Sequence, residues 1–99
     1  MNFSSPERLD TSNKGTKDTF GKEDIWALGC IAYYLSTFRF PYDDTDSAKV
    51  IMKILEGEHK PLTEYGKSLE LSNLVDSMLQ KSPHDRPSII EILNTSKII

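Results

Sequence analysis

Cysteine is almost absent from this sequence, in which Cys30 is the single example. One cysteine rules out a disulfide within the chain. The two histidines, His59 and His84, stand in separate polar stretches, so no set of residues has the paired spacing of a structural zinc site. Because Cys30 lies in an apolar stretch, we expect its thiol to be buried as a small hydrophobic group, which suits a reducing compartment.

Long apolar runs and clustered glycines are also lacking. The longest uncharged stretch, residues 25–38, falls short of the roughly 20 apolar residues that cross a bilayer. The 5 glycines stand singly, so none of them forms a phosphate-binding loop. Residues 1–6 carry neither a basic patch nor an apolar run, which argues against a signal peptide. We therefore expect no membrane association and a location in the cytoplasm or the nucleus.

Positive charge is not in excess, since 12 Lys and Arg residues face 15 Asp and Glu residues and the formal net charge is -3. That balance argues against general affinity for nucleic acid, which needs a basic face. With 37% hydrophobic and 27% charged residues the chain has the composition of a globular protein. Its 99 residues are enough for one small domain or for a piece of a larger one.

Residues 25–38 are uncharged, and their apolar side chains fall on every side of a helical wheel. A helix that is apolar all round is a buried helix, so we predict a central helix over residues 24–37 around which the chain packs. Asp24 opens this helix. It is either an ordinary residue of a helix start, favoured by capping and by the macrodipole, or a carboxylate held for particular donors. The residues alone leave both interpretations open.

Shorter helices are predicted on both sides of this central one. A helical turn begins at Pro6 with Ser5 as its cap, and a polar loop follows. Three amphipathic helices then start at Asp46 or Thr45, at Ser68, and at Ser88, which opens a capping box. Their inward positions are Val50, Ile51, Ile54 and Leu55; Leu71, Leu74, Val75, Met78 and Leu79; and Ile89, Ile92 and Leu93. No stretch has a strand pattern, so the predicted fold class is all-α.

Three separated motifs give the chain a family resemblance. Phe3-Ser4-Ser5-Pro6-Glu7 resembles the end of the activation segment of eukaryotic protein kinases. Asp24-Ile25-Trp26-Ala27-Leu28-Gly29-Cys30 resembles the start of the central helix of the kinase large lobe, and Asp85-Arg86-Pro87-Ser88 resembles the arginine block before the last helix of that lobe. The order of the three motifs agrees with the family. Ala27, the run of residues 53–57 and the run of residues 85–89 are most similar to the NIMA-related serine/threonine kinases.

The resemblance implies a helical C-lobe subdomain of the protein kinase-like fold, without the N-lobe and the catalytic loop. Residues 1–10 would be the end of the activation segment, residues 11–23 a loop, residues 24–37 the central helix and residues 45–95 the remaining C-lobe helices. The sequence departs from the family at three places. Phe3 replaces the usual Tyr, Tyr34 stands where the family generally has Glu, and the loop before Asp24 is longer than usual.

The resemblance also implies roles for single residues. Glu7 would pair with Arg86 and fasten the end of the activation segment to the helical core; the alternative is two exposed charges worth under about 1 kcal/mol. Asp24 would accept backbone N–H groups of the catalytic loop. Trp26 would pack under the substrate-binding segment or serve as a plain core residue, and Gly29 would allow close backbone approach. Phe3, Ser5, Pro6 and Glu7 would contribute to the peptide-substrate groove.

The motifs that perform kinase chemistry are missing from the sequence. It has no glycine-rich nucleotide loop, no V-A-I-K lysine, no H-R-D catalytic loop and no D-F-G. We therefore expect no catalytic, cofactor-binding or metal-binding residues in this chain, and ATP and magnesium would belong to the complete kinase. The predicted function is a C-lobe scaffold that is inactive alone and helps to receive a protein substrate. The alternative is a non-catalytic interaction module, whose protein partner would cover the exposed part of the central helix.

Overall fold

The computed structural model describes residues 4–9 and 21–95, and every structural statement below concerns these residues. They form helices and connections, without a strand. In chain order the elements are α1 (Pro6–Leu9), α2 (Lys22–Thr37), α3 (Ser47–Glu56), the 3-10 helix η2 (Leu62–Tyr65), α4 (Leu69–Met78), the 3-10 helix η3 (Pro83–Asp85) and α5 (Ile89–Thr95). The predicted all-α fold is therefore confirmed.

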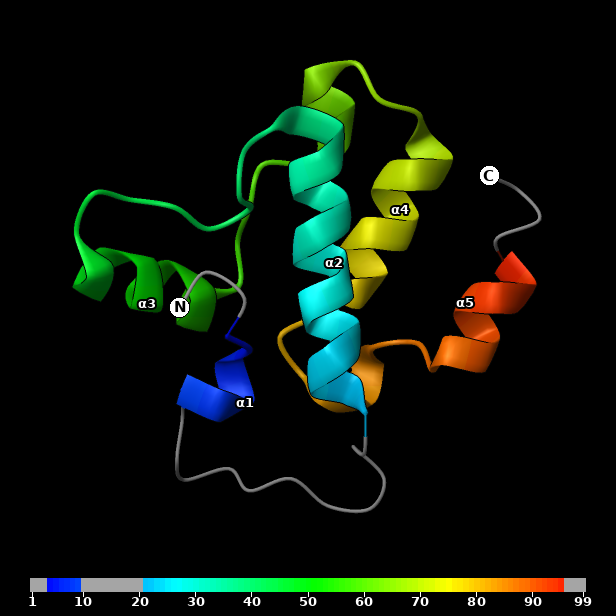
Figure 1. Ribbon diagram of the computed structural model, residues 1–99, viewed down its shortest axis with the longest axis horizontal. Coiled ribbons are helices and arrows are strands. Elements are labelled where there is room, and N and C mark those ends of the chain that lie inside the picture. Colours follow the sequence, from blue (N-terminus) through cyan, green and yellow to red (C-terminus); the bar gives the residue numbers. More distant parts are fainter. Residues whose placement is uncertain (1–3, 10–20, 96–99) are drawn as a thin grey trace.

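Helix α2 stands at the centre, with α4 alongside it and α1 and α3 together on its other flank (Figure 1). Its buried residues Trp26, Cys30 and Tyr33 meet Val75, Met78 and Leu79 from α4 and the turn that ends it. The remaining members of this core cluster are Ile25, Tyr42, Val50, Ile54, Leu62 and Ile92. The core is therefore built between one side of α2 and the elements that follow it in the chain.

Helix α2 begins at Lys22, two residues before the predicted start. The reason is Gly21, whose φ of 80° lies in the left-handed region and turns the chain into the helix. Asp24 consequently lies in the first turn, where a carboxylate is favoured by the positive end of the macrodipole. At the other end Phe38 adopts a left-handed φ of 59°, and its N–H donates to the carbonyl of Tyr34.

The prediction that α2 is buried on all sides is wrong for the described residues. Leu28, Ile31, Leu35 and Phe38 are exposed, the last by 78%. Their spacing puts them on one side of the helix, opposite the buried residues, and we call them the open side of α2. The described elements leave this side of α2 exposed, so the predicted apolar surface is present but only partly buried.

The caps of α3 and α4 are those that the sequence predicts. Asp46 Oδ1 accepts a hydrogen bond from the N–H of Ala48 at 2.9 Å, and Ser68 Oγ accepts from the N–H of Leu71 at 3.2 Å. Gly57 ends α3 with a φ of 77°. Local side-chain chemistry therefore sets these boundaries. The 3-10 helix η2 interrupts the stretch predicted as a loop, and its Leu62 is fully buried.

Helix α5 has the predicted start but not the predicted inner face. The N–H of Ser88 donates to Glu91 Oε1, and the N–H of Glu91 donates to Ser88 Oγ, which is a complete capping box. Of the three residues predicted to face inward only Ile92 is buried, whereas Ile89 is 53% and Leu93 is 61% exposed. Figure 1 shows α5 apart from α2 and α4, and Ile92 is its one residue in the core cluster of the described residues.

Among the described helices, none has both the length and the apolar character needed to span a bilayer.

Candidate functional site

Arg86 holds together segments that are far apart in the sequence. Its side chain is 0% exposed, and η3 ends at this residue. Two of its N–H groups donate to the Glu7 carboxylate, each at 2.7 Å. The others donate to the backbone carbonyls of Gln80 at 2.8 Å, Lys22 at 3.0 Å and Lys81 at 3.2 Å. A guanidinium has five N–H donors, so every donor of Arg86 is used. We call this arrangement the Arg86 clamp.

Glu7 is the acidic partner of the clamp, and its side chain is only 8% exposed. Burial by itself raises the pKa of the Glu7 carboxyl, but the hydrogen bonds and positive charge of Arg86 outweigh burial, so the net pKa lies below its ordinary value. Both oxygens of Glu7 meet the guanidinium edge, a bidentate geometry that a lysine cannot supply. The predicted Glu7–Arg86 pair is therefore present, and it joins α1 to the connection after α4.

Trp26 forms the apolar floor beneath this pair. Its side chain is 0% exposed, and the guanidinium carbon of Arg86 lies 4.9 Å from the centre of its ring system. On the indole a cation–π contact of this kind adds to the hydrogen bonds of Arg86. Tyr42 stacks on the same side chain at 5.6 Å with nearly parallel planes. Trp26 thus acts as a core residue that also contacts Arg86, and its packing under a substrate-binding segment stays a prediction.

Other clamp contacts fix the chain on either side. The ammonium group of Lys22 donates a hydrogen bond to the carbonyl of Arg86, while Arg86 donates to the carbonyl of Lys22. Ser5 and Pro6, which precede Glu7, are buried. The start of α2, the start of α1 and the segment before α5 are therefore held at one point.

Gly29 lies at a close contact between α2 and the end of α4. A Cβ atom placed on it would come within 2.9 Å of Met78 Cβ and 3.0 Å of Leu79 Cδ2. Side chains do not tolerate such distances, so the absence of a Cβ at this position lets the two helices touch. This is the close approach that the sequence predicts for Gly29.

The remaining predicted site residues are not brought into the clamp. Asp24 is exposed and makes no hydrogen bond or ion pair with another residue of the described part of the chain. Its predicted role toward a catalytic loop stays a prediction. Phe3 lies outside the described residues, as does most of the loop predicted over residues 11–23.

A second polar cluster, centred on His59, has no counterpart among the sequence predictions. Its Nε2 lies 2.7 Å from Asp76 Oδ1, and its Nδ1 lies 3.3 Å from the hydroxyl of Tyr42. The hydroxyl of Tyr33 donates to the carbonyl of the neighbouring Lys60 at 2.6 Å. These contacts tie the connection after α3 to α2 and α4. The partners of His59 stand 17 residues away on each side, a separation that matches no local motif.

Cys30 is the remaining residue with reactive chemistry. Its side chain is fully buried, and burial raises the pKa of its thiol to about 12. Because the thiolate is the nucleophile, a thiol in this state is inert. Its expected role as a small hydrophobic core residue agrees with this environment.

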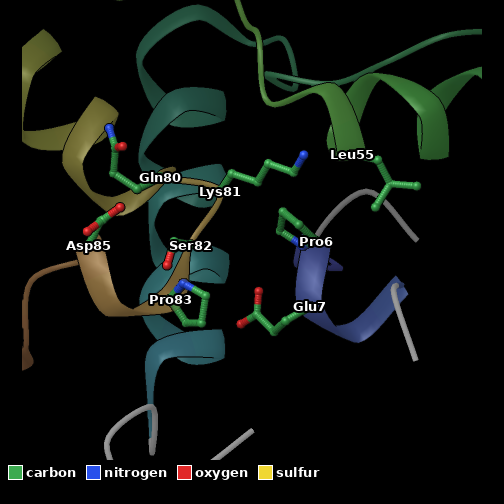
Figure 2. Close-up of a pocket in the computed structure, with 8 residues that line it drawn as sticks. All are labelled: Pro6, Glu7, Leu55, Gln80, Lys81, Ser82, Pro83 and Asp85. Atoms are coloured by element: carbon green, nitrogen blue, oxygen red, sulfur yellow. The ribbon is translucent and has the colours of Figure 1, made fainter. Parts of the chain in front are cut away.

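A pocket of about 340 Å³ lies beside the clamp, between α1, the end of α3 and the connection after α4 (Figure 2). Its lining residues are Pro6, Glu7, Leu55, Gln80, Lys81, Ser82, Pro83 and Asp85. One wall therefore includes the acidic partner of Arg86, and another includes the segment whose carbonyls hold the same guanidinium.

The motif order and the clamp geometry agree with one protein family. Residues 1–97 match the family model described as protein kinase domain. The chain belongs to the protein kinase domain family. Human serine/threonine-protein kinase Nek5 is 40% identical over 72 residues, which are 73% of this chain and 10% of Nek5. Human serine/threonine-protein kinase Nek11 is 38% identical over 92 residues, which are 92% of this chain and 13% of Nek11. The predicted similarity to NIMA-related serine/threonine kinases is therefore confirmed.

The fold of the kinase domain is matched as well. A crystal structure of the Rad53 kinase domain and SCD2 in complex with AMPPNP superposes with a TM-score of 0.82 at 24% identity. The superposition covers 96% of this chain and 36% of that chain. The chain thus corresponds to the helical C-lobe part of a serine/threonine kinase domain, and it spans about a tenth of the length of the two Nek relatives.

The family implies ATP and magnesium for a complete kinase, and the residues of this chain do not fit them. The motifs that cradle phosphates and hold magnesium in kinases are absent from its sequence. Within residues 4–9 and 21–95 no group of three or more His, Cys, Asp or Glu residues is arranged to hold a metal ion.

Proposed function

We propose that this chain is the C-lobe scaffold of a serine/threonine protein kinase that transfers the γ-phosphoryl group of ATP to a protein hydroxyl. In that complete kinase it would hold the end of the activation segment and form part of the peptide-substrate groove. The observation that carries the proposal is the saturated Arg86 clamp, which fixes α1 at the place where the activation segment would end.

The clamp suits this task because α1 cannot hold itself in place. It spans four residues, Pro6–Leu9, and isolated helices shorter than about 12 residues are marginal in water. Glu7 fastens this turn to a rigid point on Trp26 and α2 through Arg86. Substrate-positioning groups must be held by such fixed support, because small displacements of a bound substrate cost catalytic rate.

The open side of α2 supports the scaffold role in this proposal. Helical spacing puts Asp24 on the same side as Leu28, Ile31 and Leu35. An unpaired carboxylate at the end of an exposed apolar stripe suits a segment that brings both backbone N–H groups and apolar side chains. The catalytic loop and the helix before it in a complete kinase would be such a segment.

A chimeric kinase tests the proposal. The segment of human Nek11 that aligns with this chain is replaced by residues 1–99, and phosphorylation of a generic protein substrate is measured with ATP and magnesium. We expect activity, and we expect Arg86→Ala to abolish most of it while Glu58→Gln, which removes an exposed carboxylate outside the clamp, leaves it unchanged. A folded but inactive chimera with intact Nek11 motifs contradicts the proposal.

The alternative is a non-catalytic interaction module derived from a kinase domain. The observation that favours it is the open side of α2, where Leu35 is 68% and Phe38 is 78% exposed. Apolar surface of this kind recruits partners or causes aggregation. Size-exclusion chromatography of the chain mixed with candidate partner proteins separates the two proposals: a defined complex favours the module, and a chain that takes no partner favours the scaffold.

A further inference from the structure

The connection between α4 and η3 carries a Ser-Pro pair, Ser82 and Pro83, that the scaffold function does not use. Ser82 is half-buried, its backbone is extended with φ -81° and ψ 127°, and it precedes η3 without a side-chain capping bond. Its neighbours Lys81 and His84 are exposed. A serine followed by proline in an extended surface connection is the substrate form that proline-directed serine/threonine kinases modify.

The position of Ser82 links it to the clamp. Ser82 and Glu7 line the same pocket of about 340 Å³, which has room for a phosphoryl group (Figure 2). The residues just before Ser82 supply two of the carbonyls that hold the guanidinium of Arg86. All five donors of Arg86 already have acceptors, so a new anion reaches the guanidinium only by displacing one of them, and Glu7 is the anionic one among them and lines this pocket.

We propose that Ser82 is a phosphorylation site whose phosphate competes with Glu7 for Arg86 and thereby loosens α1. A proline-directed kinase would transfer the γ-phosphoryl group of ATP to Ser82 Oγ. The new O–P bond forms as the bond to the leaving ADP breaks, and the hydroxyl proton passes to the catalytic base of that modifying kinase.

Charge explains the competition. A phosphoserine carries a charge of about -1.5 to -2 at neutral pH and pairs strongly with arginine, but it repels a nearby carboxylate. In the wild-type chain it meets Glu7 and destabilises the clamp. In a Glu7→Gln chain the same phosphate meets an Arg86 that has lost its anionic partner. The phosphate then stabilises the fold, so the sign of its effect reverses.

Access to Ser82 depends on local opening of the connection between α4 and η3. Pro83 is buried, so the modifying kinase acts when this connection opens locally. Loss of the Glu7 contact weakens the clamp and raises the population of the locally open connection, in which Ser82 is accessible. The Glu7→Gln chain should therefore be modified faster than wild type, whereas Glu58→Gln, the same chemical change at an exposed position, should not.

The first experiment incubates the purified 99-residue chain with a proline-directed kinase and ATP and maps the product by mass spectrometry. We expect modification at Ser82 that is lost in Ser82→Ala and in Pro83→Ala. We then expect phosphorylation to lower the thermal midpoint of wild type by roughly 4–8 °C and to raise that of Glu7→Gln. Absence of phosphate at Ser82, or a shift of the same sign in both chains, overturns the proposal.

A second measurement needs no variant and remains informative if Glu7→Gln fails to fold. Release of α1 loosens residues 4–9, so deuterium exchange in the peptide that contains Glu7 should be roughly fivefold or more faster in the phosphorylated wild-type chain. An unchanged rate contradicts the competition with Glu7. Both readouts concern the stability of the chain itself, so they fail or succeed independently of the kinase activity tested in the Nek11 chimera.

Discussion

The two sides of α2 differ in how completely their chemistry is matched. On one side Trp26 is fully buried under Arg86, and each donor of that guanidinium has an acceptor. On the other side Leu35 and Phe38 are exposed, although they belong to the same uncharged stretch. The described residues therefore bury one side of α2 and leave the apolar side chains of the other side exposed.

The largest effect is expected from removing the centre of the completed side. Arg86→Ala leaves the Glu7 carboxylate buried without a partner, and such a loss typically costs about 3–5 kcal/mol. Urea unfolding of the chain measures the change. Arg86→Lys keeps the charge without the bidentate geometry, so it should lose less. A loss below about 1 kcal/mol in Arg86→Ala would show that the clamp behaves like an exposed ion pair.

Overpacking the contact between α2 and α4 comes next. Gly29→Ala forces a methyl group to within 2.9 Å of Met78 Cβ, and such insertions typically cost about 1–3 kcal/mol. Leu28→Ala, one residue earlier and 39% exposed, is the control on the open side and should cost less. Thermal unfolding compares them. Equal losses of stability in the two variants would show that the buried side of α2 is no more tightly packed than its open side.

The pH dependence of stability should carry a smaller contribution from the same clamp. The folded pKa of Glu7 lies below its ordinary value of 4.5. The ionised carboxyl therefore contributes stability above pH 4.5, and this contribution disappears as pH falls through the folded pKa. Unfolding free energies measured from neutral to acidic pH should fall more steeply in wild type than in Glu7→Gln. Parallel curves for the two chains would contradict this.

The smallest effect on stability is expected on the open side of α2. Leu35→Ser removes an exposed apolar side chain, and surface changes of this kind usually alter stability by less than about 0.5 kcal/mol. It should nevertheless reduce self-association of the isolated chain, as measured by light scattering at increasing concentration. Unchanged self-association would show that the open side of α2 is not the surface through which the chains associate.

Local chemistry explains what could be predicted from the residues alone. The caps at Asp46, Ser68 and Ser88 depend on atoms a few residues apart, and their hydrogen bonds are present. The exposure of Ile89 depends on where α5 lies relative to the other helices. The sequence of a seven-residue helix does not indicate that position. The start of α2 was misplaced because the left-handed turn at Gly21 lies outside the apolar pattern.

The candidate site was predictable only through the family resemblance. Glu7 and Arg86 stand 79 residues apart, and nothing in their spacing indicates a contact. The kinase motifs supplied that pair, as well as the close approach at Gly29. They supplied nothing for the pairing of His59 with Asp76, because that contact lies outside the motifs.

The saturation of Arg86 has a consequence for how this lobe assembles. Its guanidinium gives up water only when the backbone of residues 22, 80 and 81 and the side chain of residue 7 have all arrived. Closing so long a loop is entropically costly, and no subset of these acceptors satisfies a dry cation. Removal of any one of these segments therefore leaves the buried guanidinium with unpaired donors, which destabilises the contacts of the other segments as well.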